Sequence, residues 1–373
     1  MVRTGDVLVV GGGVIGCAIA YELAKAGLFV TLVERGTPGC EASSAGAGML
    51  APQSENAALG PMLTLGLASK ALYPDLALEL RERTGLDVEY ETRGDLHCFL
   101  DEGDEAVGRA AFAWQREAGF KAELLGRADA LALEPDLSPE VRGCLFLPED
   151  HWVNNPRLVT ALAHAAALEG VTFARGEVGT ILRSKDRVTG VSVGGETLRA
   201  ALVILAAGAW SGQLAATAGL RLPVGPARGQ IVCLEGIPRR HHHLLHVRGH
   251  YVVPRVNGEI LLGASMEWVG FTKQVTAKVA RDILDDVLRL VPSLGQLPIK
   301  ATWAGFRPWA PDERPIIGPW PALEGLVLAT GHFRNGILLA PVTARLVREL
   351  LVDGKPSLDL TPFLPDRFVT EER

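Results

Sequence analysis

Cysteine is scarce in this sequence, and its spacing follows no pattern. Five cysteines are scattered along 373 residues, and no two have the C-x-x-C spacing of zinc or redox sites. An odd, unpatterned set fits a reducing compartment better than a disulfide framework, so we expect a cytoplasmic protein. The five are Cys17, Cys40, Cys98, Cys144 and Cys233.

An excess of charge of one sign is also lacking. The chain has 37 Lys and Arg against 43 Asp and Glu, a formal net charge of −6, and no block of like charge. This balance argues against a nucleic-acid partner.

Long apolar runs are missing as well, and no segment has enough uninterrupted apolar residues to span a membrane. The apolar stretch 7–20 is broken by three consecutive glycines and matches a nucleotide-binding pattern. We therefore interpret it as part of the fold rather than as a cleaved signal peptide, and we expect no membrane partner.

Metal-ligand patterns are equally scarce. Histidines gather between residues 241 and 250, but consecutive histidines point in different directions in any regular structure. No cysteine or carboxylate completes a ligand set beside them, so we expect no metal. The histidines are His241, His242, His243, His246 and His250.

The most informative stretch is VLVVGGGVIGCAIAYELAKAGLFVTLVER, residues 7–35. An apolar run typical of a buried parallel strand leads into G-x-G-x-x-G, a helical pattern follows, and a second strand ends in Glu34. The glycines let the backbone approach a pyrophosphate, the helix N-terminus offers free N–H groups, and the acid can bind a ribose. The pattern predicts a bound dinucleotide; the alternative is a tight turn that binds nothing.

Two further strand–glycine–helix junctions follow. Residues 198–206 predict one unbroken strand that reaches Gly208 and a helix near Trp210. Residues 326–329 predict another strand, followed by a turn and a helix over 337–352. In a doubly wound sheet such junctions return the chain to the edge of the sheet where a cofactor binds. The loop 36–55 is rich in small residues, so its backbone can approach a ligand.

The predicted secondary structure changes from residue 226 onward. Tyr251–Val256 and 259–263 are joined by Asn257-Gly258, a type I′ hairpin signal, which predicts an antiparallel sheet. A chain of this length is also long for one core. We expect a second domain, 84–145 with 226–300, inserted into a first one made of 1–83, 146–225 and 301–373.

Six stretches resemble the D-amino-acid oxidase family of FAD-dependent oxidoreductases, and within it the glycine oxidases of the thiamine-biosynthesis type. They are GGGVIGCAIAYELAKAG, SSAGAGMLAP, ALVILAAGAWSG, HYVVPR, WAGFRP and GHFRNGILLAP, spread from residue 7 to residue 341. The resemblance implies an α/β fold: an FAD-binding, Rossmann-like (glutathione-reductase-like) domain with an inserted antiparallel α+β substrate domain.

The resemblance also implies an activity. The chain would oxidise glycine and similar small amines, such as sarcosine or D-alanine, and O₂ would reoxidise the flavin to give H₂O₂. A role in thiamine thiazole biosynthesis and a homotetramer are implied too. FAD would be non-covalent. Some sarcosine oxidases attach FAD through a cysteine late in the chain, but the last cysteine here, Cys233, lies well before the C-terminal motif.

The resemblance assigns site residues as well. Arg307 and Tyr251 would bind the substrate carboxylate, and Arg334 would contact the ligand from the flavin side. The cofactor would be held by Gly11, Gly13, Val14, Ile15, Gly16, Glu34, Arg35, Ser43, Ser44, Ala47, Gly48, Met49, Val178, Gly208, His332, Phe333, Arg334, Asn335, Gly336 and Ile337.

The residues support the substrate assignment independently. A carboxylate in a partly dry pocket needs a cation, and arginine binds it bidentately. Arg307 lies at a strand end between Phe306 and Pro308, as a pocket wall would, although a surface salt bridge is the alternative. Tyr251 could instead be a core aromatic, and Met266 could line the pocket or fill the core. Hydride transfer needs alignment and a neutral amine rather than a strong protein base, so the lack of an evident acid–base pair is consistent.

Three other functions compete with this prediction. The nearest is a dehydrogenase of the same fold that passes electrons to a quinone. An NAD(P)-linked reductase shares the first glycine motif. A flavoprotein without catalytic activity is the third.

Overall fold

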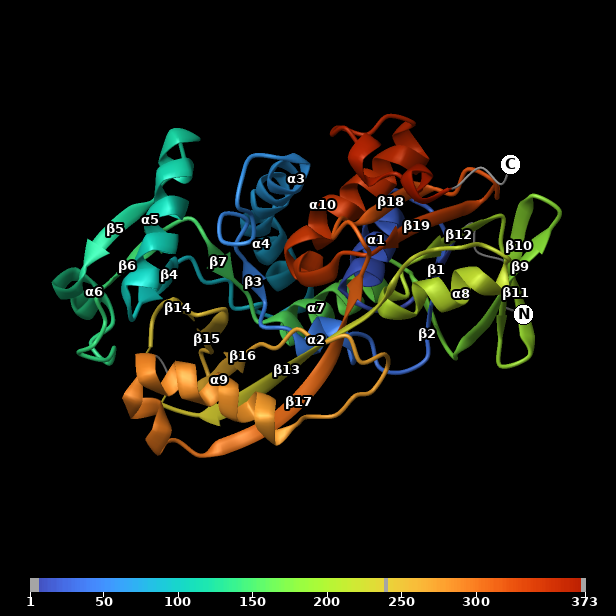
Figure 1. The fold of residues 1–373 in the computed structure, drawn as a ribbon. Helices are drawn as coiled ribbons and strands as arrows, with labels where there is room; N and C mark the ends of the chain where they lie inside the picture. The colour runs from blue at the N-terminus through green and yellow to red at the C-terminus, as the bar shows by residue number, and fades with distance from the viewer. Residues whose placement is uncertain (1–6, 238–240, 370–373) are drawn as a thin grey trace.

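The computed structural model describes residues 7–237 and 241–369 (Figure 1). Residues 1–6 and 370–373, at the outer ends of the expected segments 1–83 and 301–373, lie outside the described residues. The same is true of residues 238–240 within the expected segment 226–300. Within the described chain, no helix combines the length and the apolar character that crossing a bilayer requires.

A six-stranded sheet has the order β18-β19-β12-β1-β2-β8. All neighbours pair in parallel except β18 with β19. Both faces of this sheet are covered: Val7 and Val9 of β1 point into one core, and Leu8 and Val10 point into another. The strands are β1 (Val7–Val10), β2 (Val30–Glu34), β8 (Thr172–Arg175), β12 (Leu202–Leu205), β18 (Ile316–Pro319) and β19 (Leu326–Thr330).

The three expected junctions are present and adjacent. β1 leads into α1, β12 into η1 and α8, and β19 into η3 and α10, and these three strands are neighbours in the sheet. Because parallel strands end at one edge, the three turns meet there. The helices are α1 (Val14–Lys25), η1 (Gly208–Trp210), α8 (Ser211–Thr217), η3 (Phe333–Asn335) and α10 (Gly336–Arg348).

The prediction of one unbroken strand over 198–206 is wrong. The structure has two strands, β11 (Glu196–Arg199) and β12, which belong to different sheets. β11 closes a three-stranded antiparallel sheet with β9 (Val178–Ser184) and β10 (Arg187–Val193). Ala200 and Ala201 carry the chain between the sheets, and two alanines in an apolar run give no sequence signal of that break.

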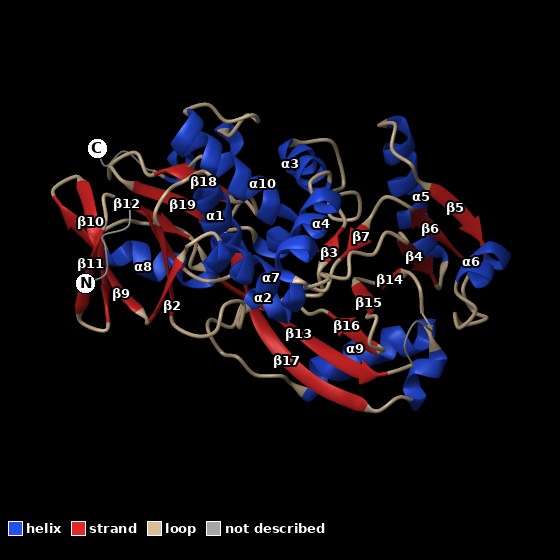
Figure 2. Cartoon of the chain, turned by 180° about the vertical axis from the view of Figure 1, so that it is seen from behind, coloured by secondary structure: helices blue, strands red, loops and turns tan. Residues whose placement is uncertain are grey.

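A second, larger sheet has the order β17-β13-β16-β15-β14-β4-β6-β5 (Figure 2). β15 and β16 form the antiparallel hairpin that Asn257-Gly258 predicts. β14 and β4 pair in parallel, so the sheet is not wholly antiparallel. Its strands are β4 (Asp95–Phe99), β5 (Glu123–Gly126), β6 (Gly143–Leu147), β13 (Gly225–Glu235), β14 (Leu244–Val247), β15 (His250–Pro254), β16 (Glu259–Gly263) and β17 (Ile299–Trp309).

The division into two domains remains a prediction, but three of its edges, after residues 145, 225 and 300, fall inside the strands β6, β13 and β17. β17 spans residue 300 and pairs along its length with β13. The backbone N–H and C=O groups of these two eleven-residue strands hydrogen-bond to one another, so the strand continues across the expected boundary. β6 spans residue 145. Arg307, which the expected boundaries place in the first domain, therefore extends from the same sheet as Tyr251.

The remaining elements flank these sheets. Sequence signals explain several starts: Asp101 and Asp104 form a capping box at α5, and Asn154 caps α7. The helices are α2 (Ala42–Ala45), α3 (Pro61–Lys70), α4 (Tyr73–Thr84), α5 (Glu102–Glu117), α6 (Arg127–Leu133), α7 (Asn155–Leu168), α9 (Ala277–Leu290), η2 (Pro292–Gln296), η4 (Glu349–Asp353), η5 (Thr361–Phe363) and η6 (Pro365–Phe368), and β3 (Met49–Leu50) pairs with β7 (His151–Trp152).

Candidate active site

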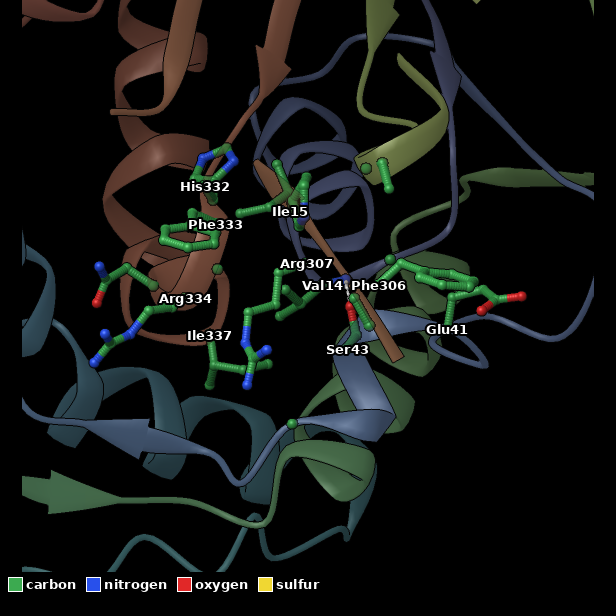
Figure 3. A pocket seen from close by; sticks show the side chains of 18 of the residues that line it. Val14, Ile15, Glu41, Ser43, Phe306, Arg307, His332, Phe333, Arg334 and Ile337 are labelled. Atoms are coloured by element: carbon green, nitrogen blue, oxygen red, sulfur yellow. Dashed lines mark hydrogen bonds between the residues drawn. The ribbon is translucent and has the colours of Figure 1, made fainter. Parts of the chain in front are cut away.

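One cavity of about 1190 Å³ joins the edge of the six-stranded sheet to the larger sheet. It exceeds the roughly 300–1,000 Å³ of ordinary small-molecule sites, so it has room for a long cofactor and a substrate. Of the predicted site residues, all line it except Gly16 and Ser44. Figure 3 shows Arg307, Arg334 and Ile337 toward one end, and Val14, Ser43 and Glu41 toward the other.

The first glycine turn forms a cradle that larger residues would fill. Gly11 has a φ of +107°, and a Cβ there would lie 2.5 Å from the carbonyl oxygen of Ala206 at the end of β12. A Cβ on Gly16 would lie 1.9 Å from the carbonyl oxygen of Gly11. Gly16 therefore acts from behind the cavity, because it lets α1 approach the turn.

The start of α1 presents backbone N–H groups to the cavity. Gly13 is the N-cap and, as a glycine, has no side chain of its own to cap the helix. Ser43 accepts a hydrogen bond from the N–H of Val14 through its Oγ, at 2.9 Å. Such a helix N-terminus favours an anionic ligand such as a diphosphate.

Glu34 lies at the end of β2, where a ribose-binding acid is expected. Its carboxylate accepts hydrogen bonds from the N–H groups of Gly12 (2.7 Å) and Gly36 (2.8 Å), so its position is fixed. The next residue, Arg35, places its guanidinium 4.1 Å from the centre of the Trp210 ring. Together with Trp210 they form one part of the cavity wall.

The loop that follows α2 is anchored by two residues that the sequence did not single out. Asn155 donates to the carbonyl oxygens of Ser43 (2.7 Å) and Gly46 (3.0 Å). Arg255 donates to the carbonyl oxygen of Ala47 (3.0 Å) and to Oδ1 of Asn155 (2.6 Å). Because Arg255 is almost fully buried, its pKa falls to about 10.

We expect Arg255→Met to destabilise the protein and weaken cofactor binding. The substitution leaves buried acceptors on Val153, Ala47 and Asn155 without their donor. Leaving a buried acceptor without its donor costs about 1–3 kcal/mol. Chemical unfolding measures the first effect, and flavin titration of the apoprotein measures the second. Arg281→Met, on the exposed face of α9, is the control; equal effects of both variants would contradict the anchoring role.

The turn after β19 supplies the C-terminal wall. His332 is buried, which lowers its pKa to about 3, so its ring is neutral and contacts the Thr343 hydroxyl at 3.0 Å. Thr330 donates to the carbonyl oxygen of Gly208 and contacts the Ser211 hydroxyl. These bonds connect the third junction to the second, and they fix the turn 332–337 against the cavity.

Arg307 and Tyr251 lie on nearby strands of the larger sheet, and each packs against a glycine. A Cβ on Gly229 would lie 2.3 Å from Nη1 of Arg307, and one on Gly263 would lie 2.7 Å from the Tyr251 hydroxyl. Arg307 donates to the carbonyl oxygen of Ser265 at 3.0 Å. Among the described residues, no carboxylate lies within ion-pair distance of Arg307, so its charge is available to an anionic ligand.

Arg334 also lines the cavity, but it already has a carboxylate partner. Its Nη2 lies 2.9 Å from each oxygen of Glu55. Glu55 is a site residue that the sequence reading missed. Of Arg307 and Arg334, Arg307 is therefore the stronger candidate for the substrate carboxylate.

Comparison with known proteins decides the family. The model of the family described as FAD dependent oxidoreductase matches residues 6–350 of this chain.

The chain belongs to this family.

The relatives of this FAD-dependent oxidoreductase cover its full length. It is 38% identical over 373 residues to the glycine oxidase of Geobacillus kaustophilus (strain HTA426), with 99% of this chain and 98% of the relative covered. It is also 38% identical over 363 residues to the glycine oxidase of Pseudomonas aeruginosa, with 96% and 98% covered. The crystal structure of the Geobacillus enzyme superposes with a TM-score of 0.93 at 37% identity, covering 98% of this chain and 99% of that one. The resemblance to the D-amino-acid oxidase family and the predicted fold class are confirmed.

FAD is the cofactor of this family, and the cavity fits it. The glycine cradle, the start of α1 and the fixed Glu34 suit a diphosphate and a ribose, and the turn 332–337 lines the cavity where the flavin is predicted. The individual residue assignments remain predictions. Asn155, Arg255, Glu55, Gly229 and Gly263 were missed because their partners are distant in sequence, and only the sequence HYVVPR, which contains Arg255, hinted at one of them.

Proposed function

We propose that this protein oxidises glycine and similar small amines such as sarcosine or D-alanine, with FAD as the hydride acceptor and O₂ as the reoxidant. The observation that supports this most is Arg307, a guanidinium beside Tyr251 with no carboxylate partner among the described residues, in a family whose relatives are named glycine oxidase. The product would be an imine that hydrolyses to glyoxylate or another oxo acid, with H₂O₂ formed on reoxidation.

Arg307 and Tyr251 contribute differently to binding of the substrate carboxylate. Arg307 pairs with the substrate carboxylate. Burial raises the pKa of Tyr251, so its hydroxyl stays protonated and can donate to the same carboxylate. Two fixed donors on one end of a small substrate orient its Cα, and orientation is the main requirement of hydride transfer. FAD, when bound, supplies the hydride acceptor.

Further aspects of the proposal come from the resemblance. The glycine imine would serve thiamine thiazole biosynthesis before it hydrolyses. In support, the chain is 39% identical over 365 residues to the bifunctional protein ThiO/ThiG of Nostoc sp. (strain PCC 7120), of which it covers 54%. Non-covalent FAD, a cytoplasmic location and a homotetramer belong to the same proposal.

An anaerobic absorbance spectrum before and after glycine tests the function. The oxidase should be yellow as purified, its flavin band should bleach with glycine, and air should restore the band with release of peroxide. Bleaching without rapid return in air would indicate a dehydrogenase that uses another acceptor. A flavin that neither glycine, sarcosine nor D-alanine reduces would reject the substrate assignment, and a colourless protein would reject the cofactor.

A further inference from the structure

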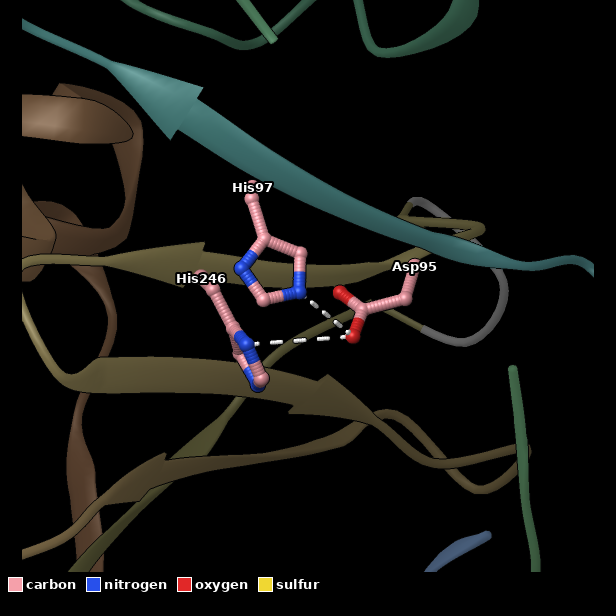
Figure 4. Close-up of side chains that lie close together, drawn as sticks. All are labelled: Asp95, His97 and His246. Atoms are coloured by element: carbon pink, nitrogen blue, oxygen red, sulfur yellow. Dashed lines mark hydrogen bonds and ion pairs between the residues drawn. The ribbon is translucent and has the colours of Figure 1, made fainter. Parts of the chain in front are cut away.

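A buried polar cluster borders the same cavity beside Tyr251. We define the Asp95–His97 cluster as Ser54, Asp95, His97, Asp150 and His246. Asp95 and His97 lie on β4 and His246 on β14, while Ser54 and Asp150 lie on loops. Ser54, His97 and His246 line the cavity, and the His246 ring lies 4.4 Å from the His97 ring and 6.1 Å from the Tyr251 ring. Figure 4 shows both imidazoles turned toward Asp95.

The hydroxyl of Ser54 fixes how protons are distributed in this cluster. Its Oγ lies 2.7 Å from Oδ2 of Asp95, 2.8 Å from Oδ2 of Asp150 and 2.8 Å from Nε2 of His97. A hydroxyl donates only one proton and accepts two. If Ser54 donated to His97, both carboxylates would have to be protonated. If it donates to Asp95, one proton on Asp150 and one on Nε2 of His97 satisfy the other two contacts.

The charges agree with this assignment. Burial, together with the nearby Asp95, raises the pKa of Asp150 to about 7, so it can hold that proton. Burial would raise the pKa of Asp95, but its hydrogen bonds with His97 and Ser54 help to keep that pKa below the ordinary value, so Asp95 remains ionised. With its proton on Nε2 and toward Asp95 (3.1 Å), His97 has an unprotonated Nδ1. Figure 4 shows this second ring nitrogen pointing away from Asp95.

The surroundings of His97 favour its charged form. Burial lowers its pKa, but the charge and hydrogen bond of Asp95, with a contribution from Glu55, outweigh burial and raise the pKa above the ordinary value of 6.5. Other charged or titratable groups that face the cluster are Arg334, which pairs with Glu55, and Tyr251. His246 is neutral near pH 7, because burial lowers its pKa to about 4. His97 is thus the imidazole of the pair that can accept a proton.

We propose that His97, oriented by Asp95 and Ser54, accepts the proton that the substrate ammonium group must lose before oxidation. This inference rests on the proposed function. The N–H bond of the ammonium breaks, an N–H bond forms at Nδ1 of His97, and the electron pair stays on the amine nitrogen. That pair then forms the C=N bond of the imine as the hydride leaves Cα. The imidazolium is stabilised by Asp95, as in other His–Asp pairs.

A bound cation is the competing occupant of this cluster. Asp95, His97 and His246 offer ligand atoms that all lie within 4.8 Å of one another. The hydrogen bonds at 2.8 and 3.1 Å that Nε2 of His97 already makes are better satisfied by a proton on this nitrogen than by a metal there. Elemental analysis of the purified holoenzyme decides between the two: about one zinc or other transition-metal ion per chain would overturn the proposal.

The kinetic test is the pH dependence of anaerobic flavin reduction by glycine, expressed as kcat/KM, for the holoenzyme and for His97→Gln. The wild type should keep its rate down to the pKa of His97, which lies above 6.5, and lose it below that pKa, where the acceptor is already protonated. The variant can use only the neutral amine, so its rate should fall tenfold for each pH unit below the pKa of the glycine amino group. We expect a loss of about 100-fold at pH 7.5, in the range of general base catalysis, and a loss of less than about threefold at pH 10.

Asp95→Asn and Ser54→Ala separate positioning from folding. Both keep His97, and both should lower its pKa, so the acid limb of the profile should shift toward lower pH, by less for Ser54→Ala. His151→Gln is the matched control, because His151 is also a partly buried strand histidine that hydrogen-bonds to a side chain, Tyr90, but it lies outside the cavity lining. Its profile should match that of the wild type. If His97→Gln fails to retain FAD, these two variants carry the test.

A second readout does not depend on turnover. Histidine ring signals of the labelled holoenzyme, assigned by their loss in His97→Gln, should give His97 a pKa above 6.5 that falls in Asp95→Asn. Coincident pH profiles, or a His97 that stays neutral down to pH 5, would overturn the proton-acceptor role while glycine oxidation stands. If glycine reduces the wild-type flavin at no pH, the proposed function fails, and this inference fails with it.

Discussion

Replacing Arg307 with alanine should raise the KM for glycine by roughly 100- to 1,000-fold while FAD stays bound. Two charge-assisted hydrogen bonds to a carboxylate are together worth about 3–4 kcal/mol, and each 1.4 kcal/mol is a factor of ten. The cofactor should remain, because Arg307 contacts Ser265, Met266, Gly229 and Tyr251, and none of these is a predicted cofactor-binding residue. Steady-state kinetics with glycine gives the KM, and the absorbance ratio of flavin to protein gives the FAD content.

Two companion variants sharpen this test. Arg307→Lys keeps the charge but loses the planar fork, so we expect an intermediate KM. Gly229→Ala keeps Arg307 itself but adds a Cβ 2.3 Å from its Nη1, so the flexible guanidinium must move and KM should rise by about tenfold. Arg281→Ala, on an exposed part of α9, should change nothing. A KM for Arg307→Ala within threefold of the wild type would remove Arg307 from the substrate site.

The sequence predicted the cofactor half of the site because its signals are local. Gly11, Gly13 and Gly16 lie within six residues, and their spacing directly encodes a strand–turn–helix. The turn 332–337 and the hairpin at Asn257-Gly258 are equally local. Each of these predictions depends on the conformation of neighbouring residues, which a short stretch of sequence determines.

The parts that the sequence did not predict depend on tertiary contacts. Arg255 anchors Ala47 across 208 positions, and Ser54 meets Asp150 across 96. Asp95 and His97 form an i, i+2 pair on one strand, a spacing that is common on any sheet face. Only the parallel pairing of β4 with β14 brings His246 beside them. The acid–base group that sequence reasoning did not find is therefore a product of sheet topology.

Replacing Gly16 with alanine should abolish FAD retention, so the protein should be colourless as purified. The added Cβ would lie 1.9 Å from the carbonyl oxygen of Gly11, and that atom is backbone, so no side chain can move aside. Either α1 shifts away from β1 or the turn opens, and both displace the N–H groups that would hold the diphosphate. Overpacking of this kind also costs about 1–3 kcal/mol of folding stability, which chemical unfolding of the apoprotein measures.

Gly225→Ala is the control for this effect, because a Cβ on Gly225 in β13 would have no heavy atom within 4 Å. That variant should remain yellow with unchanged stability. The comparison isolates the contact between Gly16 and Gly11 from the general cost of replacing a glycine. If Gly16→Ala bound FAD as tightly as the wild type, α1 would tolerate displacement. The close approach of helix to turn would then not be what positions the cofactor.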